Sequence, residues 1–121
     1  FKTYSEYVET LDITSGVVNV DLSIAQSFEL SVDADVTNFK LFNPPSGATA
    51  FTIKITQDST GGYSVGIGTF KNSLDNDIDV KFGGGVVPIV TTTADATDIY
   101  SFMTFDSGST LFGVVGGQNF T

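Results

Sequence analysis

Apolar and polar side chains alternate along much of this chain. The alternation is clearest in four stretches, residues 18–22, 28–33, 51–56 and 78–82. An extended strand points successive side chains to opposite faces, so a period of two predicts a strand with one buried and one exposed face. Each of the four stretches therefore predicts a half-buried strand.

Three further stretches carry apolar residues on both faces of the predicted strand: residues 39–42, 99–105 and 111–115. Two interpretations are open for them. They are central strands of a single core, or strands whose outer face meets another subunit. Many of their side chains are Phe, and a fully buried Phe contributes about 2–3 kcal/mol. Surplus apolar faces beyond one core would indicate an oligomer interface, and both interpretations stay open at this point.

Clusters of Gly, Pro, Asp, Asn and Ser separate the strands, mostly at intervals of about 8–12 residues. This rhythm is typical of all-β domains, since two-faced strands bury their apolar sides by packing sheet on sheet. We expect an all-β fold, an antiparallel β-sandwich of about 8–10 short strands with a jelly-roll-like topology.

The N-terminal residues have a mixed pattern. Tyr4, Tyr7, Val8 and Leu11 have helical spacing, but Leu11 and Ile13 continue at a period of two. The second pattern predicts a strand over residues 7–13. Residues 1–16 are accordingly expected to be an N-terminal arm or a first strand, and residues 17–121 the β-sandwich domain.

Several residue types are missing from the chain. It has no His, Cys, Trp or Arg, and its 14 acidic residues against five lysines give a net charge of −9. Triads and dyads that use His or Cys are excluded, so we expect no enzyme. A strongly anionic surface disfavours nucleic acid and anionic membranes, and no apolar run approaches the length of a membrane span. We therefore expect neither a nucleic-acid partner nor membrane insertion.

The densest acidic cluster contains Asp75, Asp77 and Asp79. An Asp-x-Asp-x-Asp run opens the calcium loop of EF-hands, because each carboxylate can turn toward one hard cation. Here the glycine after the third ligand is replaced by Val80, and Val86 stands where the final Glu is needed. The alternatives are a calcium site at Asp75, Asp77 and Asp79, or a solvated loop without a cofactor.

Pairs of carboxylates at short spacing invite comparison with glycosidases. The pairs are Asp33 with Asp35, Asp95 with Asp98, and Glu6 with Glu9. Their neighbours are turn residues, and Asp favours turns because it bonds its own backbone. Structural roles are therefore expected for these pairs.

A carbohydrate-binding β-sandwich with a bound calcium is the alternative function. Sugar would stack on Tyr4, Tyr63 or Tyr100, or contact a hydroxyl-rich strand at residues 91–93. Trp, the usual platform for sugar rings, is missing from the chain, which weighs against this alternative.

Four short segments occur in a recognisable order: FKLFNPP at residues 39–45, FTIKITQD at 51–58, PIVTTTADATDIYSF at 88–102 and LFGVVGGQNF at 111–120. Together they resemble a β-rich domain of tailed-phage virion proteins, of the marine and cyanophage type. That domain often ends tail fibres or other surface proteins. The likeness spans roughly residues 17–121, and its motifs look like strand, turn and packing positions. Leu111 and Phe112 stand where the pattern has an aromatic Trp-Tyr pair.

The resemblance implies a non-enzymatic structural protein displayed on the virion surface. Two roles fit, a tail-fibre module that contacts the host and a capsid decoration protein. The implied partners are copies of the chain, with a homotrimer as the expected oligomer, other virion proteins, and a host surface glycan or receptor. Exposed loops at residues 58–62, 72–79 and 106–109 are expected to make such contacts.

Overall fold

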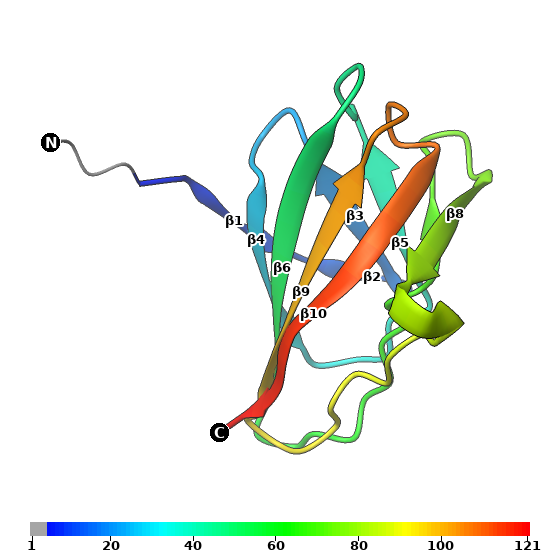
Figure 1. The fold of residues 1–121 in the computed structure, drawn as a ribbon. Helices are drawn as coiled ribbons and strands as arrows, with labels where there is room; N and C mark the ends of the chain where they lie inside the picture. Colours follow the sequence, from blue (N-terminus) through cyan, green and yellow to red (C-terminus); the bar gives the residue numbers. More distant parts are fainter. Residues whose placement is uncertain (1–4) are drawn as a thin grey trace, which may run out of the picture.

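The structure is a computed structural model that describes residues 5–121. Ten β-strands and one short 3₁₀ turn make up the described part (Figure 1). Their bounds are β1 (Val8–Leu11), β2 (Ile13–Thr14), β3 (Val17–Asp21), β4 (Ser27–Val32), β5 (Asn38–Phe42), β6 (Thr49–Gln57), β7 (Phe70–Lys71), β8 (Asp77–Phe82), η1 (Gly83–Gly85), β9 (Thr97–Thr104) and β10 (Thr110–Phe120). The predicted all-β class and the predicted number of strands are confirmed.

The ten strands form one sheet that nearly closes into a barrel. The strand order is β1-β4-β6-β9-β10-β8-β7-β5-β3-β2. The two strands at the ends of this order are consecutive in the chain, separated only by Asp12. The N-terminal segment therefore pairs with both edges of the sheet: β1 with β4, and β2 with β3. The predicted first strand over residues 7–13 is found as this divided strand.

A tight hairpin fixes the second of these contacts. Thr14 lies opposite Val17, so the loop between β2 and β3 has only two residues. Both of them have positive φ, 50° at Ser15 and 78° at Gly16. Positive φ at both central residues is the geometry of the type I′ turn, whose twist suits adjoining antiparallel strands.

The prediction of antiparallel pairing throughout is wrong. Five of the nine strand pairings are parallel, namely β1 with β4, β4 with β6, β3 with β5, β5 with β7 and β8 with β10. The chain alternates between a front half of the sheet (β1, β4, β6, β9 and β10) and a back half (β8, β7, β5, β3 and β2) (Figure 1). Four of the five parallel pairs, all except β1 with β4, join strands that come next but one in the chain.

Aromatic rings fill the space between the two halves. The ring of Phe102 on β9 lies 5.3 Å from that of Phe51, 4.9 Å from that of Phe70 and 6.0 Å from that of Phe82, measured between centroids. Phe51 belongs to the front half, and Phe70 and Phe82 to the back half. Phe102 is fully buried and joins the two halves into one core.

A glycine in β10 makes room for this ring cluster. The ring of Phe82 packs directly against the backbone of Gly113, at the position that a Cβ atom would occupy. β8 and β10 pair in parallel with Phe82 beside Gly113. Close packing of an aromatic ring on a neighbouring strand requires a residue without a side chain there.

The strand predicted at residues 91–93 is wrong. Between η1 and β9 the chain forms no strand, although Val90 within this connection is buried. Side chains satisfy the backbone of Thr91 in place of a neighbouring strand: its N–H donates to Asp98 at 2.8 Å, and its carbonyl accepts from Gln57 at 3.1 Å.

Candidate functional site

The three aspartates expected to bind calcium do not converge in the structure. Each contacts a different lysine: Asp75 lies 3.0 Å from Lys40, Asp77 lies 2.9 Å from Lys71, and Asp79 lies 3.2 Å from Lys81. Among the described residues no group of three acidic side chains is arranged to hold a metal ion. The arrangement gives the expected calcium site no support, and calcium binding here stays a prediction.

The loop before β8 is closed by an asparagine. The side-chain oxygen of Asn72 accepts the N–H groups of Leu74 at 2.9 Å and Asn76 at 3.0 Å. Asp75 has a φ of 64°, and its N–H donates to the carbonyl of Asn72. Asn commonly organises turns in this way. The side chain of Asn72 thus organises the loop from within. The predicted exposed loop at residues 72–79 is shorter in the structure, because β8 begins at Asp77.

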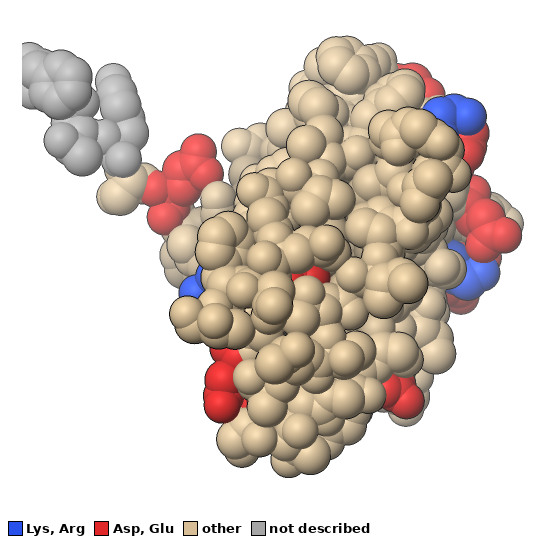
Figure 2. All heavy atoms as spheres, turned by 60° about the horizontal axis from the view of Figure 1, so that its bottom comes forward, with Lys and Arg blue, Asp and Glu red and all other residues tan. Residues whose placement is uncertain are grey.

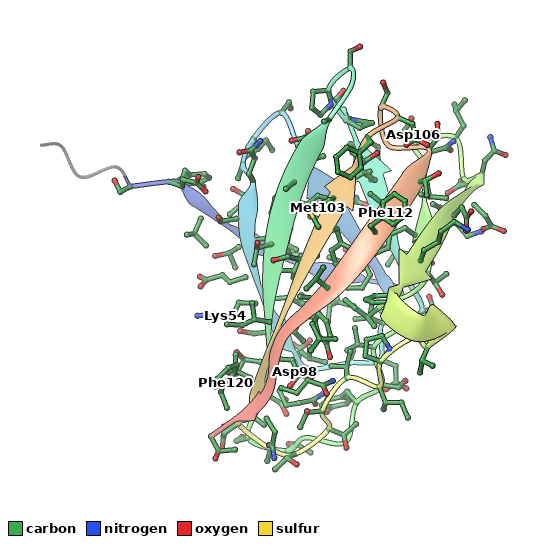
Figure 3. All side chains as sticks on the ribbon, in the orientation of Figure 1. Lys54, Asp98, Met103, Asp106, Phe112 and Phe120 are labelled. Atoms are coloured by element: carbon green, nitrogen blue, oxygen red, sulfur yellow. The ribbon has the colours of Figure 1, made fainter. Side chains whose placement is uncertain are left out.

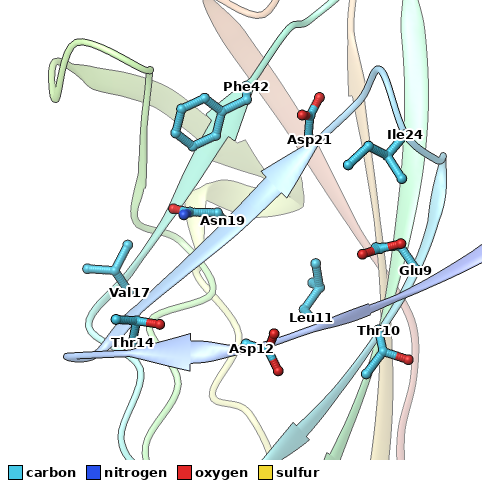
Figure 4. Close-up of a pocket in the computed structure, with 10 residues that line it drawn as sticks. All are labelled: Glu9, Thr10, Leu11, Asp12, Thr14, Val17, Asn19, Asp21, Ile24 and Phe42. Atoms are coloured by element: carbon cyan, nitrogen blue, oxygen red, sulfur yellow. The ribbon is translucent and has the colours of Figure 1, made fainter.

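A groove lies where the N-terminal segment passes from one sheet edge to the other. It has a volume of about 440 Å³ and opens between β1 and β3, which are not paired (Figure 4). Glu9 and Asp12 line it from the N-terminal segment, Asn19 and Asp21 from β3, and Phe42 from β5. No pattern in the sequence joins these residues, because only the topology brings the three segments together.

Two of the three carboxylates that line this groove, Glu9 and Asp21, are hydrogen-bonded to nearby residues. Asp21 accepts hydrogen bonds from the side chain of Asn43 at 2.9 Å and from the hydroxyl of Ser23 at 2.7 Å. These bonds lower the pKa of Asp21 below its usual value. Glu9 accepts from the hydroxyl of Tyr7 at 2.8 Å. The groove is polar and anionic, but it lacks an assembled pair of acid and base.

A buried polar cluster surrounds Asp98 at the start of β9. The carboxylate is 1% exposed. One oxygen accepts from the N–H of Thr91 at 2.8 Å and the hydroxyl of Tyr100 at 2.7 Å, and the other accepts from the N–H of Asn119 at 2.8 Å. The amide of Gln118 also donates to the Tyr100 hydroxyl, at 2.9 Å. Asp98 thus ties the 86–96 connection and the end of β10 to the middle of the sheet.

The environment of Asp98 keeps it ionised. Burial by itself would raise the pKa of the carboxyl, but the hydrogen bonds from Thr91, Tyr100 and Asn119 outweigh burial and lower it below its usual value. Burial and the bond to Asp98 raise the pKa of the Tyr100 hydroxyl. Asp98 is buried and hydrogen-bonded, whereas Asp95 lies at an exposed turn, so the two carboxylates do not face a common site.

The aromatic side chains proposed to stack on sugar are poorly placed for it. Tyr100 is fully buried in the core, which contradicts its expected exposure as a platform. Tyr63 is half-buried against the core, and Tyr4 lies outside the described residues. The burial of Tyr100 was predictable from the alternating pattern. Tyr100 is two residues before Phe102 on the same strand, so both side chains point inward.

Exposed apolar side chains lie on β9 and β10 and in the connection after η1; Met103 and Phe112 point outward, whereas Val115 lies opposite the buried Tyr100. We define the apolar patch as Met103, Phe105, Phe112, Val114, Val115 and Val86, all of which are exposed. Figure 3 shows Met103 and Phe112 side by side on the two strands, where they are paired across the sheet. In the face shown by Figure 2, charged side chains lie mainly along the margins. The two-sided strands at 99–105 and 111–115 predicted part of this patch, whereas Val86 lies in a connection without a strand pattern.

Comparisons with protein-family models, curated protein sequences and solved structures gave no match. The fold and the candidate surfaces therefore rest on the chain's own geometry. In residues 5–121 no helix is long and apolar enough to cross a membrane.

Proposed function

We propose that this chain is a non-enzymatic structural module displayed on the surface of a bacteriophage particle, as part of a tail fibre or as a capsid decoration protein. The order of four motifs that resembles phage virion domains supports the proposal. These motifs fall on β5 and the turn after it, on β6, on the connection leading into β9, and on β10. They occupy strand, core and turn positions, in keeping with a scaffold that is used for display.

The proposal depends on the contrast between buried, bonded polar groups and exposed aromatic side chains. The buried polar groups near Asp98 are bonded to one another, while Phe105 and Phe112 remain 67% and 42% exposed. Catalytic sites need polar groups that can reach a substrate, whereas assembled structural proteins need apolar surface for their neighbours. The exposed side chains of Phe105 and Phe112 are therefore suited to apolar contact with a neighbouring protein.

The test is the location of the chain in the particle. An antibody raised against the folded chain is applied to purified particles of the virus that encodes it, and bound antibody is located by electron microscopy. Labelling over the whole capsid identifies a decoration protein, and labelling at the tail identifies a fibre module. Unlabelled particles whose digests also lack peptides of this chain would overturn the proposal.

The carbohydrate-binding alternative has a narrower basis, since Tyr100 is buried and the three aspartates contact separate lysines. A glycan array with and without EDTA separates the two functions. We expect no specific sugar signal from the isolated chain in either condition. A signal that EDTA removes would favour the alternative.

A further inference from the structure

We propose that the groove between β1 and β3 binds an extended, positively charged segment of a neighbouring protein, which adds to the sheet as a further strand. The inference deepens the proposed function and rests on it, because the neighbour would be another protein of the virion. The open strand edges at the groove argue for strand addition, and the acidic side chains that line it argue for a basic sequence.

Two strand edges face the groove without a strand between them. β1 pairs only with β4, so its other edge is open among the described residues. β3 pairs with β5 along its whole length, but β2 covers its other edge only at Val17 and Val18. Residues 19–21 therefore have no strand beside them on this side, in the part of the chain that the structure describes. Extended peptides commonly bind proteins at such an edge, through main-chain hydrogen bonds.

The groove has room for an extended segment. Its volume is about 440 Å³, and Ile24, which lines it, also lines a second hollow of about 310 Å³. In Figure 4 the side chains of Leu11 from β1 and Ile24 from the loop after β3 point into the space between the two strands. Because side chains alternate along a strand, one face of the added segment would meet these apolar groups and the other would face the polar rim.

The charge of the groove favours Lys or Arg on the bound segment. Glu9, Asp12 and Asp21 line the groove, and none of the described residues that line it is a lysine. Glu6 adds a further carboxylate at the second hollow. The side-chain hydrogen bonds that Glu9 and Asp21 accept come from neutral donors, so both carboxylates keep their negative charge. Opposite charge steers a partner toward such a hollow and fixes its register there.

The same carboxylates disfavour a second copy of this chain as the partner. A net charge of −9 makes the close approach of two copies unfavourable, most of all at an edge that is itself acidic. Charged side chains on open edges commonly protect sheets against pairing with one another. A basic segment removes this repulsion and gains ion pairs, so the groove distinguishes a basic partner from a copy of its own chain.

The experiment uses a fluorescent, end-blocked peptide of about eight residues, a usual strand length, in which Val and Lys alternate. Its binding to the full chain is measured by fluorescence anisotropy at about 0.15 M salt, where distant surface charges are screened. One control peptide has Glu in place of every Lys. Two further peptides keep every Lys but are N-methylated on one or the other set of alternate backbone nitrogens, which removes hydrogen-bond donors and retains the charge.

A pair of protein variants tests the location of the bound peptide. Glu9→Gln combined with Asp12→Asn removes two negative charges from the groove, and we expect it to bind the Val-Lys peptide about fivefold more weakly. Asp33→Asn combined with Asp95→Asn is the matched control, because it removes the same charge at two exposed turns outside the groove. Circular dichroism and thermal unfolding confirm that both variants are folded. Amide NMR shifts of the wild-type chain are expected to change at residues 8–12 and 19–21.

The proposal is supported if the Val-Lys peptide binds saturably, the groove variant binds it more weakly than the control variant, and at least one methylated peptide binds about tenfold or more weakly. It is overturned if the Val-Lys peptide does not bind, if the Glu peptide or both methylated peptides bind equally well, if the groove variant binds like the control, or if the shifts lie elsewhere.

The outcome for this contact is separate from the outcome for the proposed function. A chain that does not bind the peptide but labels the particle refutes the contact and leaves the display function standing. A chain that binds the peptide at the groove but is missing from the particle keeps the contact and loses the display function.

Discussion

The outer surfaces of the two halves of the sheet differ in chemical character. On the back half, three lysines contact three aspartates, which we call the lysine–aspartate face: Lys40 with Asp75, Lys71 with Asp77, and Lys81 with Asp79. On the front half, β4 and β6 carry one ion pair, Glu29 with Lys54, whereas β9 and β10 carry the apolar patch, with Phe112 42% exposed. Both halves nevertheless supply aromatic rings to one core.

This difference shows that the residues that build the core do not determine the character of the residues on the outer surface. Phe70 and Phe102 come from opposite halves and touch in the core, while Lys71 beside Phe70 and Met103 beside Phe102 belong to the outer surface. The fold is satisfied with either kind of outer surface.

The largest expected effect comes from breaking the core that the two faces share. Phe102→Ala leaves a cavity beneath Phe51, Phe70 and Phe82, and we expect a loss of about 3–5 kcal/mol in the free energy of unfolding. Because the rings join both halves, the loss should appear as one cooperative urea transition by fluorescence and by circular dichroism. Two separate transitions would mean that the halves are independent.

Removing the charge of Asp98 is next in size. Asp98→Asn places an amide among three donors, and we expect a loss of about 2–4 kcal/mol at neutral pH. The pKa of Asp98 is lowered in the folded state, so its stabilisation is present above the usual pKa of a free aspartate. It is lost as the pH falls below about 4 through the folded pKa.

The difference in stability between wild type and Asp98→Asn, measured by urea unfolding, should therefore shrink as the pH falls from 6 to 3. Asp33→Asn, at an exposed turn, is the control for general effects of acid. A difference that stays constant with pH would contradict the assigned role of the carboxylate.

A smaller effect is expected where the two halves pack most closely. Gly113→Ala places a methyl group where the Phe82 ring lies, so the ring must move, and we expect a loss of about 1–3 kcal/mol. Gly47→Ala has open space around the added Cβ and a positive φ, so it reports backbone strain without a clash. Thermal unfolding that shows equal losses for both variants would argue against the close packing of Phe82.

The apolar patch should matter little to the stability of the monomer. Phe112→Thr replaces a half-exposed ring by a residue suited to strands, and we expect a change below about 1 kcal/mol in a dilute sample. Urea unfolding at low and high concentration measures it. A large loss in the dilute sample would place Phe112 in the monomer's own core and remove the contrast between the faces.

Calcium should have the smallest effect of all on the lysine–aspartate face. Because the carboxylates of Asp75, Asp77 and Asp79 contact separate lysines, we expect no change in melting temperature with millimolar calcium or with EDTA. A rise that grows with calcium concentration would reveal the site expected from the sequence, since a ligand of the folded state stabilises it by mass action. The variant Asp77→Asn should then lose the rise.

The sequence predicted strands better than it predicted their neighbours. Alternation says which face a side chain occupies, and it located β3, β4, β6 and β8 closely. It carries no information on the direction of the adjacent strand, so the parallel pairings were missed. The groove between β1 and β3 was missed for the same reason, since Glu9, Asn19 and Phe42 meet only through the topology.

The alternation of side chains along each strand predicted the positions of the candidate site residues better than the composition did. Asp98 and Tyr100 share the parity of Phe102, which places all three inside the sheet. Spacing suggested a carboxylate pair of Asp95 with Asp98, and composition suggested a sugar platform at Tyr100. The apolar patch was predictable where both parities of a strand were apolar, at Met103 and Phe112, and not at Val86 in an irregular connection.

The divided N-terminal strand has a consequence for solubility. Exposed strand edges present unpaired backbone groups that recruit other chains and promote aggregation. β1 covers the edge of β4, and β2 covers the start of the edge of β3, so residues 8–14 protect two edges at once. Loss of this short segment would uncover the edges of β4 and β3 and leave both ends of the sheet able to pair with another chain.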